Sequence, residues 1–308
     1  MKKSTLIFLL LVKVSISYSQ DSISFKKLVN QANEYLSLYE RLSPSLPSEF
    51  DTDFHLIQEL RLSTDVKKEL NHSKDSYGEL IKDSILNSDL IDFLQGKIVG
   101  KINEVVNHEV SKNQDITKLF HYALTIVKSV DNKLYNFSLD GKNGGTFRSR
   151  ISWMYFKDID SSDFYDIEEL QHLNSYCKLP DAFSVFREHG YEEIEVLQTD
   201  EGVKYLLTGQ TQQCSFCFYN HIQLVCFKEG KFETDFYYAI ESRGLDTDIS
   251  YDTEEKKIEV NYVTDDLTPN CACVSNEKRI NTNVNGEIIK KECYCTFFFN
   301  GTTFELAK

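Results

Sequence analysis

The sequence predicts an α+β fold, with a helical N-terminal region over residues 20–113 followed by an antiparallel β domain over residues 114–308. Two observations support this prediction. Apolar residues repeat at helical spacing as far as about Asn113, and from Leu124 onward they lie in short runs separated by turns. The chain also contains 17 Tyr and 21 Phe but 4 Pro, and aromatic side chains suit the half-buried surface of a sheet.

Residues 1–19 have the composition of a cleaved export signal. Two lysines, Lys2 and Lys3, precede an apolar run over Leu6–Val12, and the segment ends in the small-x-small sequence Ser17-Tyr18-Ser19. A segment of this length is too short to span a bilayer. We therefore expect a secreted or periplasmic protein with no membrane span.

The charge of the chain limits its partners. Its formal net charge is −14, and removal of the basic signal segment would make it more acidic. Such a surface repels phosphates, so nucleic acid is not expected as a partner. We expect instead an extracellular ligand, either a glycan or a protein.

The helical region contains two clear amphipathic stripes, over Phe25–Leu42 and Ile98–Val110. Ser24 is a candidate N-cap for the first helix and Pro44 a candidate stop. Shorter helical pieces are expected around Phe54–Leu62 and Leu80–Leu94.

The β domain is expected to form a meander of about ten to twelve strands, which would fill a sandwich or a strongly curved sheet. An incomplete propeller is the alternative. The expected strands are Leu124–Ser129, Leu134–Leu139, Thr146–Phe156, Ile194–Thr199, Val203–Gly209, Phe216–Phe227, Phe232–Ala239, Ile258–Thr264, Ile288–Phe299 and Thr302–Leu306. The segment 166–190 shows no alternation, and a helix or an irregular excursion is expected there.

All 8 cysteines lie in the second half of the chain. They are Cys177, Cys214, Cys217, Cys226, Cys271, Cys273, Cys293 and Cys295. Export to an oxidising compartment favours structural disulfides. A zinc site made of the C-x-x-C motif and one C-x-C motif, or partial pairing that leaves a reactive thiol, are the alternatives.

The two C-x-C motifs predict a pairing without fixing it. In a strand, residues i and i+2 share a face, so antiparallel pairing would set Cys271 against Cys295 and Cys273 against Cys293. A two-residue turn at Asn285-Gly286, however, would place Cys293 opposite Lys278. The pairing therefore needs a bulge or a longer loop.

A polar segment near the start of the β domain is a candidate binding site. Asp131, Ser138, Asp140 and Thr146 are expected near the ends of adjacent strands, and Gly144-Gly145 would allow close backbone approach. The alternative is that these are ordinary turn residues.

The same segment carries a resemblance to known proteins. Ser129–Asp140, followed by Gly144-Gly145-Thr146, resembles a recurrent stretch of uncharacterised secreted bacterial proteins, and Phe299-Asn300-Gly301 with Phe304 is similar to their closing hairpin. Leu139 stands where that pattern has an aromatic residue. The resemblance implies N-terminal helices, a β-rich second half and export, and it implies no activity.

An acidic segment has the spacing of a calcium-binding loop. Oxygen-bearing side chains occupy positions one, three, five, nine and twelve of that spacing. These are Asp158, Asp160, Ser162, Asp166 and Glu169. Asp163 stands at the sixth position, where the loop needs glycine, so a solvated acidic turn is the alternative to a structural Ca²⁺ site.

No H-E-x-x-H, G-x-S-x-G or phosphate-binding loop occurs in the sequence. We therefore expect a secreted, disulfide-stabilised, non-enzymatic binding or structural module. The alternative is a secreted hydrolase acting on glycan or peptide, with a pair of carboxylates that the sequence does not mark.

Overall fold

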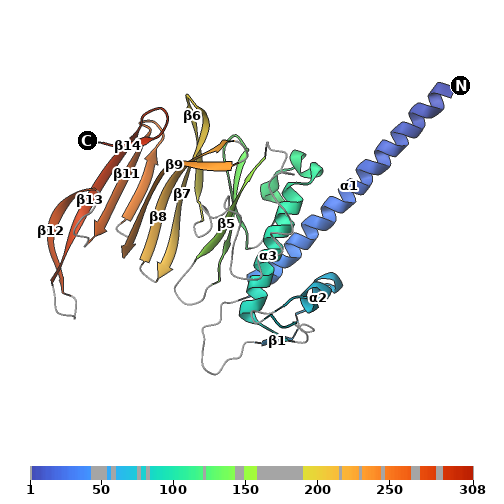
Figure 1. The fold of residues 1–308 in the computed structure, drawn as a ribbon, viewed down its shortest axis with the longest axis horizontal. Coiled ribbons are helices and arrows are strands. Elements are labelled where there is room, and N and C mark those ends of the chain that lie inside the picture. The colour runs from blue at the N-terminus through green and yellow to red at the C-terminus, as the bar shows by residue number, and fades with distance from the viewer. Residues whose placement is uncertain are drawn as a thin grey trace. The chain divides into compact units, whose positions relative to one another are not determined.

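The computed structural model describes residues 2–42, 54–56, 60–74, 78–80, 84–120, 123–142, 149–157, 190–214, 217–228, 231–243, 247–264, 271–281 and 287–307 (Figure 1). Of residues 2–20, 54–56, 84, 213–214, 231, 242–243, 274–281 and 287–290 it describes the backbone alone. The predicted α+β class is confirmed, with helices first and antiparallel sheets after them. The described residues up to Leu124 form one compact unit, and those from Thr125 onward form another.

Among the described residues, three α-helices build the first unit: α1 (Lys2–Arg41), α2 (Thr64–Asn71) and α3 (Asn87–Val106). Helix α1 packs against α3, and Gln95 Nε2 donates a hydrogen bond of 3.0 Å to the hydroxyl of Tyr39 between them. Helix α2 begins after Ser63, whose hydroxyl accepts the backbone N–H of Val66, as expected of an N-cap. Two short 3-10 helices, Glu109–Asn113 and Ile116–Lys118, follow α3.

Two expectations for the helical region are wrong. Helix α1 continues through Ser24, so this residue is not an N-cap. The segment expected to be helical around Phe54–Leu62 begins with a strand, β1 (Phe54–Leu56), which pairs antiparallel with β2 (Ser84–Leu86). Pairing with a distant segment here overrides the local apolar spacing.

Three antiparallel sheets build the second unit. The β3–β5 sheet contains β3 (Thr125–Lys128), β4 (Leu134–Asp140) and β5 (Arg150–Phe156). The β6–β9 sheet contains β6 (Glu193–Thr199), β7 (Gly202–Cys214), β8 (Cys217–Lys228) and β9 (Lys231–Arg243). The β10–β14 sheet has the order β10 (Thr247–Asp252), β11 (Lys257–Thr264), β13 (Glu287–Phe299), β12 (Ala272–Asn281), and β14 (Phe304–Leu306) also pairs with β13.

The β6–β9 sheet is covered on both faces. Leu206 and Leu224 pack into a core with Val260 and Cys293 of the β10–β14 sheet. On the opposite face, Val225 packs into a core with Leu134 and Met154 of the β3–β5 sheet, and Tyr205 and Leu207 join it. The three sheets therefore stack in layers, as the predicted sandwich requires.

A buried lysine links the last two sheets. The ammonium group of Lys204 on β7 contacts Asp235 Oδ2 at 2.7 Å and Glu201 Oε2 at 2.9 Å. It also donates to the backbone carbonyl of Thr302, in the turn between β13 and β14, at 2.9 Å. Lys204 is 1% exposed, and the two carboxylates and the carbonyl supply the partners that a buried ammonium group requires.

Candidate functional site

The polar residues predicted near the start of the β domain make turn and sheet contacts. Asp131 lies in the β3–β4 turn, where its carboxylate accepts hydrogen bonds from Ser129 Oγ, from the Lys133 N–H and from the Tyr205 hydroxyl. Asp140 accepts the N–H of Lys142 at 2.8 Å. These are the bonds by which aspartate stabilises a turn.

The other two residues of that prediction differ in position. Ser138 is fully buried in β4, and its hydroxyl accepts a hydrogen bond of 3.1 Å from Arg150 on β5. Thr146 lies outside the described residues. Ligand binding at this segment stays a prediction.

The predicted calcium loop cannot be placed. Asp158, Asp160, Ser162, Asp166 and Glu169 all lie outside the described residues, as does Cys177. Among the side chains that are described, no group of His, Cys, Asp and Glu could hold a metal ion. The calcium site therefore stays a prediction.

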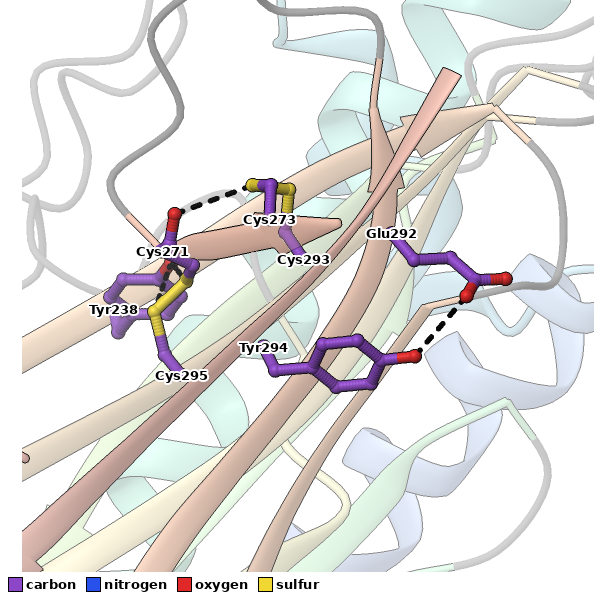
Figure 2. Close-up of a disulfide and its surroundings, with 7 residues drawn as sticks. All are labelled: Tyr238, Cys271, Cys273, Glu292, Cys293, Tyr294 and Cys295. Carbon is purple, nitrogen blue, oxygen red and sulfur yellow. Dashed lines mark hydrogen bonds between the residues drawn. A yellow bond between two sulfur atoms is a disulfide. The ribbon is translucent and has the colours of Figure 1, made fainter. Parts of the chain in front are cut away.

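The two C-x-C motifs form two disulfides between β12 and β13, Cys271–Cys295 and Cys273–Cys293 (Figure 2). Their Cα atoms are 5.1 Å and 4.0 Å apart, as expected for residues on adjacent antiparallel strands. The sequence left the pairing between the two motifs unassigned, and the observed pairing is the one that strand alternation allows. The disulfides face the core between the last two sheets, where the Tyr238 hydroxyl contacts Cys271 Sγ at 3.1 Å.

Two features adjust the register to allow this pairing. Residues 282–286 lie between the paired ends Asn281 and Glu287, and the register shifts again between Ser275 and Arg279. Beyond this irregularity, Cys273 stands directly opposite Cys293. The bulge that the sequence required is therefore present in β12.

Of the remaining cysteines whose side chains the structure describes, one is disulfide-bonded and the other is a free thiol. Cys217 is also disulfide-bonded, to a partner outside the described side chains, and the backbone of Cys214 lies opposite it across β7 and β8. Cys226, expected as a disulfide candidate, is instead a free and buried thiol. Its cross-strand neighbours are Lys204 and Glu233, so no cysteine stands opposite it. Burial, followed by the nearby Asp235 carboxylate, raises the pKa of the thiol.

The β10–β14 sheet has an exposed aromatic pair that the sequence alone did not indicate. Along β13, Cys293, Cys295 and Phe297 face the core, so Tyr294 and Phe298 project from the other side. These two rings are 50% and 49% exposed. Four residues of strand separate them by about 13 Å.

We call this side of the sheet the outer face. Its members alternate with the core residues of β10, β11, β13 and β14. They are Asp248, Ser250, Asp252, Lys257, Glu259, Asn261, Val263, Glu292, Tyr294, Thr296, Phe298 and Glu305. Side chains on neighbouring strands meet in direct pairs, so Asn261 stands beside Tyr294, and Lys257 and Glu305 stand on either side of Phe298.

Carboxylates dominate the electrostatics of the outer face. Lys257 contacts Glu255 at 2.7 Å and Glu259 at 2.8 Å, and the hydrogen bonds that its ammonium group donates to these two carboxylates raise its pKa. The Tyr294 hydroxyl donates to Glu292 at 3.3 Å, and the negative charge of Glu292 raises the pKa of this tyrosine. Figure 2 shows the Tyr294 ring directed toward Glu292 and away from the disulfides.

Two other pairs of described carboxylates lie close together. Glu201 and Asp235 meet at the ammonium group of Lys204. In the helical unit, Glu34 and Asp65 line a cavity of about 420 Å³ between α1 and α2, where Glu34 accepts the N–H of Ser63. Acid–base hydrolysis needs two acids in opposed environments. On α3, burial and the nearby Asp89 carboxylate raise the pKa of Asp92.

Comparison with known protein families, with curated proteins and with solved structures finds no match to this chain. Within the residues that the structure describes, none of the helices combines the length and the apolar composition needed to cross a membrane. The disulfides are compatible with an extracellular protein.

Proposed function

We propose that this chain is a secreted, non-enzymatic module that binds an extracellular ligand through the outer face of the β10–β14 sheet. The observation that carries the proposal is the half-exposed pair Tyr294 and Phe298 on a sheet that two disulfides bridge from the opposite face. Exposed aromatic rings surrounded by polar residues are typical of binding surfaces.

The rigidity of the backbone at Tyr294 also supports a binding role for the outer face. Tyr294 lies between two disulfide-bonded cysteines, Cys293 and Cys295, so its backbone is held before any ligand arrives. Tyrosine and phenylalanine lose little conformational entropy when a partner covers them, because each has two side-chain torsions. A preorganised aromatic site therefore binds at a lower entropic cost than a flexible loop.

Export supports the extracellular setting. The segment 1–19 has the composition of a signal peptide, and structural disulfides form and persist in oxidising compartments. The hydrolase alternative gains no support from Glu201, Asp235 and Glu34, because the first two are paired with Lys204 and Glu34 accepts the N–H of Ser63 at the start of α2.

A double variant, Tyr294→Ala with Phe298→Ala, tests the proposal. The wild-type protein would be measured by biolayer interferometry against immobilised neutral polysaccharides, acidic polysaccharides, basic peptides and acidic peptides. We expect at least one of these polymers to bind, and the double variant to bind it at least about ten-fold more weakly.

Tyr237→Ala is the matched control, because Tyr237 is 46% exposed but lies on β9 of another sheet. Its affinity should equal that of the wild type. Equal binding by the double variant and the wild type, or no binding to any of the polymers, would show that the outer face is not a ligand site.

A further inference from the structure

We propose that the ligand of the outer face is an extended cationic peptide segment whose basic residues alternate with others. This inference rests on the proposed function and specifies its ligand. Three observations on the outer face support it: the excess of carboxylates, the carboxylate beside each ring, and the spacing of the two rings.

The first observation is the sign of the charge around the rings. The carboxylates of the outer face are Asp248, Asp252, Glu259, Glu292 and Glu305. Lys257 is its one basic member among the described side chains, and Glu255 and Glu259 already contact it. The outer face therefore carries an excess of negative charge, on a chain whose net charge is −14.

The arrangement of these carboxylates has an energetic consequence. Ser250 is the direct neighbour of Glu259, so Asp248 and Asp252 are the diagonal neighbours of Glu259, at about 7–8 Å. Like charges at this separation repel one another, since it is within the Debye length of about 8 Å at physiological ionic strength. A cationic ligand would relieve this repulsion, a polyanion would increase it, and a neutral glycan would leave it unchanged.

The second observation is that the rings and the carboxylates offer both contacts that a basic side chain uses. A guanidinium or ammonium group is attracted to the face of an exposed aromatic ring. It also forms charge-assisted hydrogen bonds with a carboxylate. Glu292 lies next to the Tyr294 hydroxyl, and Glu305 stands beside Phe298, so each ring has an acid within reach of the same cation.

The third observation is the spacing of these two aromatic positions. Tyr294 and Phe298 are four residues apart on one strand, a separation of about 13 Å. In an extended peptide, side chains on one face repeat every two residues, or about 6.6 Å. Residues i and i+4 of such a peptide therefore reach both rings, with residue i+2 between them near Glu259.

Two synthetic peptides of six Arg and six Ser test this inference: one alternates Arg and Ser over twelve residues, and the other has the order Arg-Ser-Arg-Ser-Ser-Arg-Ser-Arg-Arg-Ser-Arg-Ser, in which no two Arg stand four residues apart. Calorimetry with the full secreted chain should give tighter binding of the alternating peptide, by at least about five-fold. Its affinity should fall by more than ten-fold between about 50 and about 500 mM NaCl, because salt screens the ion pairs.

Variants separate the contribution of charge from that of the rings. Glu259→Gln with Glu292→Gln should weaken binding of the alternating peptide at least five-fold. Glu193→Gln is the matched control, an exposed carboxylate on β6 of another sheet, and should leave the affinity unchanged. Tyr294→Ala with Phe298→Ala should also weaken binding.

Each contrary outcome has a distinct meaning. If a neutral or acidic polysaccharide binds in a manner that depends on Tyr294 and Phe298 while the peptides do not, the cationic ligand is wrong and the proposed function stands. If both peptides bind equally, the alternating spacing is wrong. If the peptides bind but neither double variant weakens them, both proposals are wrong, because the attraction then comes from the acidic chain as a whole.

Discussion

The β6–β9 sheet and the β10–β14 sheet have the same antiparallel pairing but differ in how many of their faces are buried. In β8, Leu224 and Val225 are both fully buried, because one faces each neighbouring sheet. In β13, Phe297 is buried while Phe298 is half exposed. A sheet covered on both faces derives its stability from packing, and a sheet covered on one face has a second face available for binding.

The state of the cysteines also differs between the two sheets. The one-sided β10–β14 sheet contains both bridges that the structure describes in full, and they lie on its buried face. The two-sided β6–β9 sheet contains the free thiol of Cys226 in its interior. The two-sided sheet also contains the disulfide-bonded Cys217 at the start of β8, so the difference between the two sheets lies in the two bridges that join β12 to β13.

Single truncations at neighbouring residues should reveal this difference most strongly. Phe297→Ala should lower the free energy of unfolding by about 4 kcal/mol, and Phe298→Ala by less than about 1 kcal/mol, since only the first leaves a cavity. In the two-sided sheet, Leu224→Ala and Val225→Ala should each cost at least about 2 kcal/mol. Urea unfolding followed by circular dichroism measures all four, and a large loss for Phe298→Ala would contradict the one-sided description.

Removal of one bridge should have the next largest effect. Cys273→Ala with Cys293→Ala opens a link with a sequence separation of 20, which should cost about 3 kcal/mol through the greater freedom of the unfolded chain. Cys226→Ala is the control, because it removes a cysteine that forms no bridge. A double variant as stable as the wild type in urea would mean that the β10–β14 sheet does not need this bridge.

Substitution of one lysine in each sheet should give the smallest difference in the free energy of unfolding. Lys204→Met removes a buried charge from between Asp235 and Glu201 and should cost about 2 kcal/mol. Lys257→Met removes a charge paired on the outer face and should cost less than about 1 kcal/mol. Equal costs would show that the buried cluster does not join the two sheets.

The contribution of Lys204 should also depend on pH. Burial acts to lower its pKa, but the hydrogen bonds to Asp235 and Glu201 outweigh this and raise the pKa above its ordinary value of 10.5. Its stabilisation is therefore fully present below pH 10.5 and is lost as the pH rises through the folded-state pKa. The wild type should accordingly lose its advantage over Lys204→Met in alkaline solution alone.

Much of the fold could be predicted because alternation is a local signal. Strands such as Leu134–Asp140 and Glu193–Thr199 agree with the expected runs to within a residue. Strand β10, Thr247–Asp252, was missed because Ile249 and Tyr251 alone mark its apolar face among polar residues. The strand at Phe54–Leu56 depends on a distant partner, which local spacing cannot indicate.

The candidate site was harder to predict for a similar reason. The three aromatic residues Phe297, Phe298 and Phe299 stand in succession, so the sequence does not indicate which of them is exposed. The answer depends on a sheet distant in sequence, which covers the Phe297 side. The pairing of the cysteines could be anticipated from their spacing, but the position of the bulge between Ser275 and Arg279 could not.

The buried thiol of Cys226 can be used to measure how often the β6–β9 sheet opens in the native protein. Enclosed within the middle layer of three sheets, this sulfur meets an alkylating reagent when the β6–β9 sheet opens. Its labelling rate in the native protein therefore measures how often that layer separates, in the way that amide exchange measures local opening. The effect on this opening of every substitution discussed above that retains Cys226 can be measured in this way, without adding a probe to the chain.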